Sequence, residues 1–326
     1  MIYPWQKRQW LQIHQQFDAG RLPHALLLTG SEGLGKLDFA RELAASILCR
    51  STSGQGAACG QCDACHLIAA GTHPDYHFLA PEDVNKVIKV DDIRALCESF
   101  SLTSQFSGHR VAVIASADNM NTNAANSLLK TLEEPGENSL LILVSARPHR
   151  FPITIRSRCQ AISFAVPETG VALQWLGDQS TMAASDASLC LKLAHGSPLL
   201  AQRLMEEEIL AQRKGLMNAL ISVAANQAVT EPSELLSKMP GERLLGWLYD
   251  WLKDLVLLQQ CGPSASLVNI DYQQQLQQFS SGSRLQDLYD LLDQVIQLRR
   301  LQSIPLNSQL LWEDLLISWG RLLKRA

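Results

Sequence analysis

The sequence lacks a large charge excess, a long apolar run and a secretory leader pattern, and each of these absences excludes a class of protein. Its 28 basic and 32 acidic side chains leave a net charge of −4, which argues against coating nucleic acid through bulk positive charge. No uninterrupted apolar stretch approaches the ~20 residues that a membrane-spanning helix needs. Because the amino-terminal segment lacks the charged and apolar regions of a signal peptide, we expect a cytoplasmic protein with no membrane partner.

Hydrophobic residues make up 46% of the 326 positions, enough to bury the cores of about two or three domains. In the amino-terminal half, short apolar runs alternate with helical patterns. Strands this apolar, separated by helices, predict an α/β domain with a mostly parallel sheet covered on both faces. The strands are expected at His24–Leu28, Asp75–Leu79, Val111–Ala115 and Leu140–Val144.

A glycine loop, Gly30-Ser31-Glu32-Gly33-Leu34-Gly35-Lys36, follows the first predicted strand and precedes a helical pattern. This is the context of a phosphate-binding loop, in which Gly30, Gly33 and Gly35 let backbone N–H groups approach phosphate oxygens and Lys36 meets the β and γ positions. The next residue is Leu37, where Ser or Thr would hold Mg²⁺. The loop therefore predicts a degenerate nucleotide site, and binding of ATP or ADP is left open.

The acidic residues that an ATPase of this topology needs are also missing. Ala115, Ser116 and Ala117 end and follow the predicted strand at 111–115, where acids should hold Mg²⁺ and orient the attacking water. Asp118 lies farther along and is interpreted as the cap of the next helix. Two missing parts of the hydrolysis machinery predict that the chain has no intrinsic ATPase activity.

Four of the eight cysteines form a spaced group, Cys49, Cys59, Cys62 and Cys65. Four thiolates suit a closed, structural tetrahedral Zn²⁺ site, and disulfides are uncommon in the cytosol. An iron–sulfur cluster ranks lower, because Ala69 stands where the ferredoxin pattern has its next cysteine. Four unrelated buried thiols remain the alternative.

The carboxy-terminal half is helical by pattern. Apolar stripes with helical spacing recur in it, which is typical of amphipathic helices. The pattern does not distinguish a face buried within a bundle from a face that meets another subunit. The stripes are Leu244, Leu248, Trp251, Leu252 and Leu255, and Leu285, Leu288, Leu292, Val295 and Ile296.

Two further motifs carry a family resemblance: Leu128-Leu129-Lys130-Thr131-Leu132-Glu133-Glu134-Pro135, and the later Ser157-Arg158-Cys159. They resemble the clamp-loader branch of the AAA+ ATPases, and the Tyr3-Pro4-Trp5 start, the four cysteines and the eroded acidic motif after the predicted strand at 111–115 narrow the resemblance further. The resemblance implies an AAA+-like α/β domain with a cysteine insertion at 1–166, a small helical lid at 167–207 and a helical collar for oligomerisation at 208–326. It also implies that Arg158 acts in trans as an arginine finger in a neighbour's ATP site, with Ser157 and Cys159 positioning the turn.

The resemblance implies partners as well. They are the gamma/tau-type ATPase subunits and the delta subunit of the bacterial DNA polymerase III clamp loader and, through that complex, the sliding clamp and primed DNA. In the lid, Leu199 stands where the family's ATPases place a second arginine, which fits a rigid, non-hydrolysing stator within a complex that has DNA-directed DNA polymerase activity. Two rival hypotheses stay open: a self-sufficient ATPase that uses the Gly30–Lys36 loop, and a zinc-dependent DNA-binding module.

Overall fold

The computed structural model describes residues 2–52, 56–82, 86–101, 104, 106, 108–179, 183–206, 209–225, 228–300 and 307–324. They form two compact units, Met1–Trp175 with Ser197–Leu200, and Leu176–Gly196 with Ala201–Ala326. The lid–collar boundary expected at residues 207 and 208 lies outside the described residues. Among the described residues, no helix combines the length and apolarity that crossing a bilayer requires.

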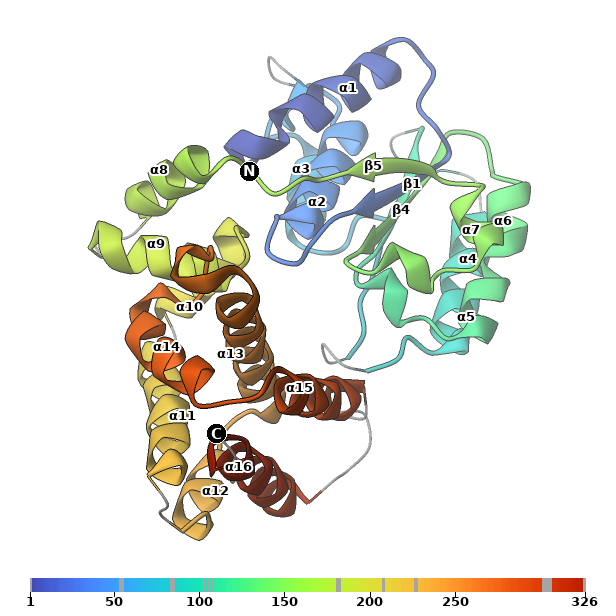
Figure 1. Ribbon diagram of the computed structural model, residues 1–326. Helices are drawn as coiled ribbons and strands as arrows, with labels where there is room; N and C mark the ends of the chain where they lie inside the picture. The colour runs from blue at the N-terminus through green and yellow to red at the C-terminus, as the bar shows by residue number, and fades with distance from the viewer. Residues whose placement is uncertain are drawn as a thin grey trace. The chain divides into compact units, whose positions relative to one another are not determined.

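The first unit is built on a five-stranded parallel sheet with the order β2-β3-β4-β1-β5 (Figure 1). This confirms the predicted α/β fold class, and each of the four predicted strands agrees with an observed strand to within a residue at either end. A fifth strand, which the sequence analysis missed, pairs with β1 at the edge of the sheet. The strands are β1 Ala25–Thr29, β2 Tyr76–Leu79, β3 Arg110–Ile114, β4 Ser139–Ser145 and β5 Gln160–Ser163.

Successive side chains of each strand point to opposite faces, so the apolar strands supply two separate cores. In β1, Leu26 and Leu28 pack with helices α1 (Lys7–Asp18) and α2 (Lys36–Leu48), whereas Ala25 and Leu27 pack against the helices of the other face. Figure 1 shows the two helical layers on either side of the sheet. The other layer comprises α4 (Val90–Ser101), α5 (Thr122–Ser127), α6 (Leu129–Glu133) and α7 (Ile153–Arg156).

The remaining helices of the first unit lie at its insertion and its carboxyl end. Helix α3 (Asp63–Ala69) follows the cysteine-rich segment, and α8 (Thr169–Gln179) carries Trp175 at the end of the unit. Short 3₁₀ turns occupy Pro4–Gln6, Ala117–Asn119 and Pro148–Arg150. All three lie beside the functional residues described below.

The second unit is all helical among its described residues, as the sequence pattern predicts. The first apolar stripe, from Leu244 to Leu255, is wholly buried. The second is mixed, because Leu288 and Val295 are buried but Leu285 is exposed. The helices that contribute residues to this unit are α8 (Thr169–Gln179), α9 (Ala184–Leu193), α10 (Pro198–Glu206), α11 (Ile209–Ala224), α12 (Thr230–Ser237), α13 (Gly241–Cys261), α14 (Gln273–Ser281), α15 (Leu285–Arg300) and α16 (Ser308–Lys324).

Candidate functional site

Arg158 lies just after α7, on a turn that presents its guanidinium to solvent. Its side chain keeps 36% of its exposure, and it donates one hydrogen bond to the carbonyl of Thr154 at 3.0 Å. A second nitrogen lies 2.8 Å from Glu133, which is itself half exposed. Ser157 donates to the same Thr154 carbonyl at 3.2 Å and so helps to close the turn. An exposed ion pair of this kind is worth only about 0–1 kcal/mol, so Arg158 can exchange Glu133 for another anion at little cost.

The backbone that carries Arg158 is anchored in the core. Phe151 and Ile155 are buried in the helical layer that contains α4 to α7. Cys159, on the other side of Arg158, packs against the same core, and burial raises the pKa of its thiol to about 11. Cys159 is therefore a neutral packing residue at neutral pH. The result is an exposed cation on a fixed support.

The glycine loop has the backbone shape of a phosphate cradle. Gly30, Gly33 and Gly35 have φ values of 144°, 75° and 75°, a region that favours glycine. Lys36, however, donates its ammonium to the loop's own carbonyls, at 2.7 Å from Gly30 and 2.6 Å from Ser31. Burial lowers the pKa of Lys36 to about 8, although nearby carboxylates oppose this shift. The lysine that would meet a phosphate is engaged within the chain.

The amino-terminal segment packs directly onto this loop. The ring of Tyr3 lies so close to Gly35 that an added Cβ there would meet it at 2.4 Å. Gln6 donates to the carbonyls of Leu34 and Gly35 at 2.8 and 2.9 Å, and Trp5 donates to Leu34 at 3.0 Å. These contacts satisfy buried loop carbonyls from inside the protein. The spacing of Tyr3, Trp5 and Gln6 along the sequence gives no signal of this packing, because the contacts join residues about 30 positions apart.

The start of α10 also meets the glycine loop. The backbone N–H of Leu199 donates to the carbonyl of Gly33 at 3.1 Å. A Cβ on Gly33 would approach the Cβ and the backbone nitrogen of Leu200 at 2.7 Å. At the position where the resemblance expects an arginine, the chain therefore places an aliphatic residue that touches the loop through its backbone.

Asp118 is the acidic residue of this region, and its role differs from the one expected from sequence. It is not a helix cap, because Asn121 caps α5 by accepting a hydrogen bond from Ala124 N at 2.8 Å. Instead, the Asp118 carboxylate accepts a hydrogen bond from Arg147 Nε at 2.9 Å. The helix starts farther along than the pattern suggested, which made the capping interpretation wrong. Arg147 is a second residue that sequence reasoning missed.

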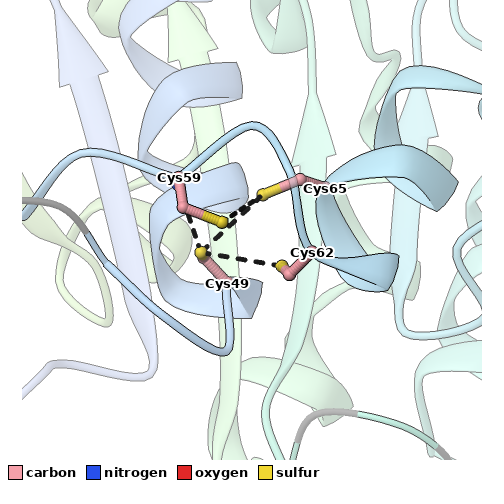
Figure 2. Close-up of side chains that lie close together, drawn as sticks. All are labelled: Cys49, Cys59, Cys62 and Cys65. Atoms are coloured by element: carbon pink, nitrogen blue, oxygen red, sulfur yellow. Dashed lines mark hydrogen bonds between the residues drawn. The ribbon is translucent and has the colours of Figure 1, made fainter.

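The predicted cysteine group comes together in space, as Figure 2 shows. The four sulfur atoms of Cys49, Cys59, Cys62 and Cys65 lie within 4.8 Å of one another. The sulfur–sulfur distances are 3.7 Å for Cys49–Cys65 and 3.9 Å for both Cys49–Cys62 and Cys59–Cys65. A tetrahedral zinc site with Zn–S bonds of about 2.3 Å has sulfur–sulfur edges of about 3.8 Å. The donor set and its dimensions therefore fit a metal ion.

The electrostatics of the cysteine group also suit a cation. A backbone hydrogen bond from Cys65, opposed by burial, lowers the pKa of Cys62 to about 6. Burial raises the pKa of Cys65 itself to about 12. Thiolates this close repel one another, and a divalent cation offsets that repulsion. The four residues could thus hold a metal ion as a closed set of ligands.

Two family models match the chain. The model described as DNA polymerase III, delta subunit, matches residues 5–168. A second, described as DNA polymerase III, delta subunit, C terminal, matches residues 207–321. The two matches cover the α/β unit and most of the helical region, respectively.

Full-length relatives are similar along almost the whole chain. The chain is 36% identical to a DNA polymerase III subunit delta′ of Pseudomonas aeruginosa, with 98% of each sequence covered. It is 33% identical to the subunits of the same name from Yersinia pestis and Escherichia coli. Those matches cover 97% of the chain in both cases, and 95% and 94% of the two relatives.

Proposed function

The chain belongs to the family of DNA polymerase III delta′ subunits, and on this premise we propose that it is a rigid, non-hydrolysing member of a clamp loader. It assembles with gamma/tau-type ATPase subunits and a delta subunit. Through that ring it takes part in opening a sliding clamp and placing it on primed DNA. Its own contribution is Arg158, given in trans to the ATP site of a neighbouring subunit, together with a stiff surface.

The observation that carries this proposal is the contrast between Arg158 and the glycine loop. Arg158 offers an exposed guanidinium on an anchored turn, whereas Lys36 is bound to the loop's own carbonyls. A phosphate would have to displace these carbonyls before it could use Lys36. Leu37 adds no metal-holding hydroxyl, and Asp118 already has a cationic partner. These features support a chain that supplies half of an ATP site to a partner and does not complete one itself.

The trans role of Arg158 is tested in a loader assembled from purified subunits. An arginine finger is worth about 10³ to 10⁵ in the rate of phosphoryl transfer, so Arg158→Ala should nearly silence the neighbouring site. Single-turnover hydrolysis then loses the phase that belongs to that site. Arg156→Ala is the matched control, because Arg156 is exposed on the same turn and carries the same charge. An unchanged hydrolysis rate with Arg158→Ala would contradict the proposal.

We propose zinc as the metal of the cysteine group, held by all four thiolates as a structural site. A closed four-cysteine shell has no open position for catalysis, so the metal contributes folding energy to the insertion. Metal analysis should find near-stoichiometric Zn²⁺ in the purified protein, and Cys62→Ser should lower both metal content and assembly. Protein that is free of zinc, with all four thiols open to titration, would rule this out.

We further propose that 167–207 serve as a lid and 208–326 as a collar for assembly, after the α/β domain of 1–166. The contact between Leu199 and Gly33 supports a lid role for the first segment. The shared apolar core of the helices from α11 to α16 supports treating the second as one domain.

A further inference from the structure

We propose that Arg147 is a positioning residue for Arg158: by binding the buried carboxylate of Asp118, it holds the segment that carries Arg158 in one conformation without nucleotide. The inference rests on the proposed trans role of Arg158. The guanidinium of Arg147 is a cation of the chain itself, so the segment that carries Arg158 needs no ligand to hold its conformation.

The contacts of Arg147 join the carboxyl ends of two neighbouring strands. Its Nε donates to Asp118 at 2.9 Å, and a second guanidinium nitrogen donates to the side chain of Asn119 at 3.2 Å. Both partners belong to the 3₁₀ turn that follows β3, while Arg147 follows β4. The backbone N–H of Arg147 also donates to Ser145 Oγ at 3.0 Å. The side chain of Arg147 thus links the end of β4 to the turn after β3, while its backbone is held locally at the end of β4.

Asp118 needs such a cation. Its side chain is only 3% exposed, and an unpaired buried carboxylate costs several kcal/mol. Its two oxygens accept hydrogen bonds from Arg147 Nε and from the backbone of Ala146, the latter at 3.3 Å. Lys36 lies near enough to attract Asp118, but its ammonium donates to the glycine loop. Arg147 is therefore the cation bonded to this carboxylate among the described residues.

The charge state of Asp118 agrees with this role. Burial by itself raises the pKa of Asp118, but hydrogen bonds from Arg147 and Ser145 outweigh it, and the net pKa lies below its ordinary value. The carboxylate is therefore ionised at neutral pH. The guanidinium belongs to the chain itself, so this link does not depend on a bound ligand.

The link extends to Arg158 through a short, hydrogen-bonded path. The carbonyl of Arg147 accepts a hydrogen bond from Arg150 N at 3.0 Å, which closes the 3₁₀ turn Pro148–Arg150. Phe151 and Ile155 then anchor the segment in the core before α7 ends at Arg156. The Arg147–Asp118 contact thus fixes the start of the segment whose later residues, Phe151 and Ile155, are held by the core.

The test uses the assembled loader with five versions of this chain: wild type, Arg147→Ala, Arg158→Ala, the double variant and Arg150→Ala. Arg150 is exposed on the same segment, so its variant is the control for lost charge. We expect Arg147→Ala to lower kcat between about 10-fold and 10²-fold, as misplacement of a catalytic group does, with KM for ATP unchanged. The double variant should be no slower than Arg158→Ala, because both changes act through one guanidinium.

A direct structural readout accompanies the kinetics. Amide hydrogen exchange at residues 153–158 should be faster in Arg147→Ala than in wild type, and unchanged in Arg150→Ala. Arg147→Lys keeps a charge beside Asp118 and should recover part of the rate. If Arg147→Ala does not fold, Asp118→Asn replaces it, since this variant keeps the shape and removes the charge.

The outcomes separate this inference from the proposed function. If Arg158→Ala slows hydrolysis while Arg147→Ala behaves as wild type, the positioning role is overturned and the trans role stands. If the double variant is slower than Arg158→Ala by the full factor of Arg147→Ala, the residues act independently and the inference also fails. If Arg158→Ala changes nothing, the proposed function itself is wrong.

Discussion

Lys36 and Arg158 are cations of the same α/β unit, and their charges are satisfied in opposite ways. Lys36 is buried and donates to two backbone carbonyls of its own loop. Arg158 is partly exposed and shares its charge with a half-exposed glutamate. Because desolvated hydrogen bonds to a charged group are worth more than exposed ion pairs, Lys36 is held and Arg158 is available.

This difference makes a prediction for Lys36→Met, which removes the ammonium and keeps most of the side chain's length. The loop carbonyls lose their charged donor, so the free energy of unfolding should fall by about 1–3 kcal/mol in urea titrations of the isolated chain. The rate of ATP hydrolysis by the assembled loader should stay unchanged. The chain alone should not turn over ATP, either as wild type or as this variant. A loss as large as that caused by Arg158→Ala would instead assign the loop a catalytic part.

Among the structural elements, the glycine loop and the 3₁₀ turn at Pro4–Gln6 behave as one unit. Tyr3, Trp5 and Trp175 form an aromatic cluster beside the loop, with ring centroids 5.0 to 5.6 Å apart. Tyr3 also donates to Asp38 at 3.1 Å, at the start of the helix that the loop leads into. The amino-terminal segment therefore stabilises the loop in the conformation in which Lys36 donates to its carbonyls.

Two glycines with similar backbone conformations test this packing. Gly35 and Gly20 have φ values of 75° and 64°, so alanine at either position incurs the left-handed penalty of about 1–2 kcal/mol. An added Cβ meets Tyr3 only at Gly35, since nothing lies within 4 Å of it at Gly20. Gly35→Ala should therefore cost about 1–3 kcal/mol more than Gly20→Ala in urea unfolding, and should alone change tryptophan emission. An equal loss of unfolding free energy in the two variants would show that the ring of Tyr3 moves away from the added Cβ at no cost.

A second element-level contact joins the end of α9 to α13. His195 has a φ of 50° and places Nε2 3.5 Å from the Asp250 carboxylate. The hydrogen bond with Asp250 outweighs burial and raises the pKa of His195. Protonated His195 therefore stabilises the folded helical unit below its ordinary pKa of about 6.5, and this stabilisation is lost as the pH rises through the higher folded pKa.

His195→Asn tests this contact, since asparagine tolerates the left-handed backbone but carries no charge. Solvent screens the pair from the exposed His195 side, so the free energy of unfolding of wild type should exceed that of the variant by about 0.5 kcal/mol at pH 5.5, and the difference should shrink by pH 9. Unfolding midpoints at the two pH values measure it. Asp250→Asn should abolish the same pH dependence, and a constant difference across this range would argue against the ion pair.

For the molecule as a whole, the proposed collar role depends on which apolar side chains the helical unit leaves uncovered. Helix α16 buries Trp312 and Trp319, and the indole of Trp319 donates to the carbonyl of Leu220 at 3.0 Å. On the same helix, Leu310 is 61% exposed and Ile317 is 39% exposed. Two apolar faces of one helix thus have different environments within this chain.

Substitutions on α16 should separate folding from assembly. Ile317→Asp and Leu310→Asp should weaken complex formation with loader subunits, measured by analytical ultracentrifugation, and leave the unfolding midpoint unchanged. Gln309→Asp introduces the same charge at an exposed polar position and should leave assembly unchanged, although it removes the hydrogen bond from Gln309 to Glu313. Trp319→Ala should cost about 3–5 kcal/mol of stability, because it opens a cavity in the core. Full assembly of both aspartate variants would place the collar interface elsewhere.

Features that depend on neighbouring residues were predictable from the sequence. The alternation of apolar side chains gave the strands, and the spacing of the cysteines gave the group seen in the structure. Strand β5 was missed because Gln160–Ser163 contains only one large apolar residue, Ile162, whereas β2, an edge strand of the same length, contains Tyr76, Phe78 and Leu79. Asp118 was misassigned because a short turn separates it from the helix that Asn121 caps.

The sequence by itself determined the fold class, the family resemblance and the loss of the hydroxyl and acids of an ATPase, because these depend on residue type and local spacing. Only the tertiary structure decided that Lys36 is bound by its own loop, that Tyr3 packs on Gly35 and that Arg147 pairs with Asp118. The last contact exists because the strand order places β4 beside β3, which brings together residues 29 positions apart. Side chains that meet through sheet order leave no spacing pattern in the chain.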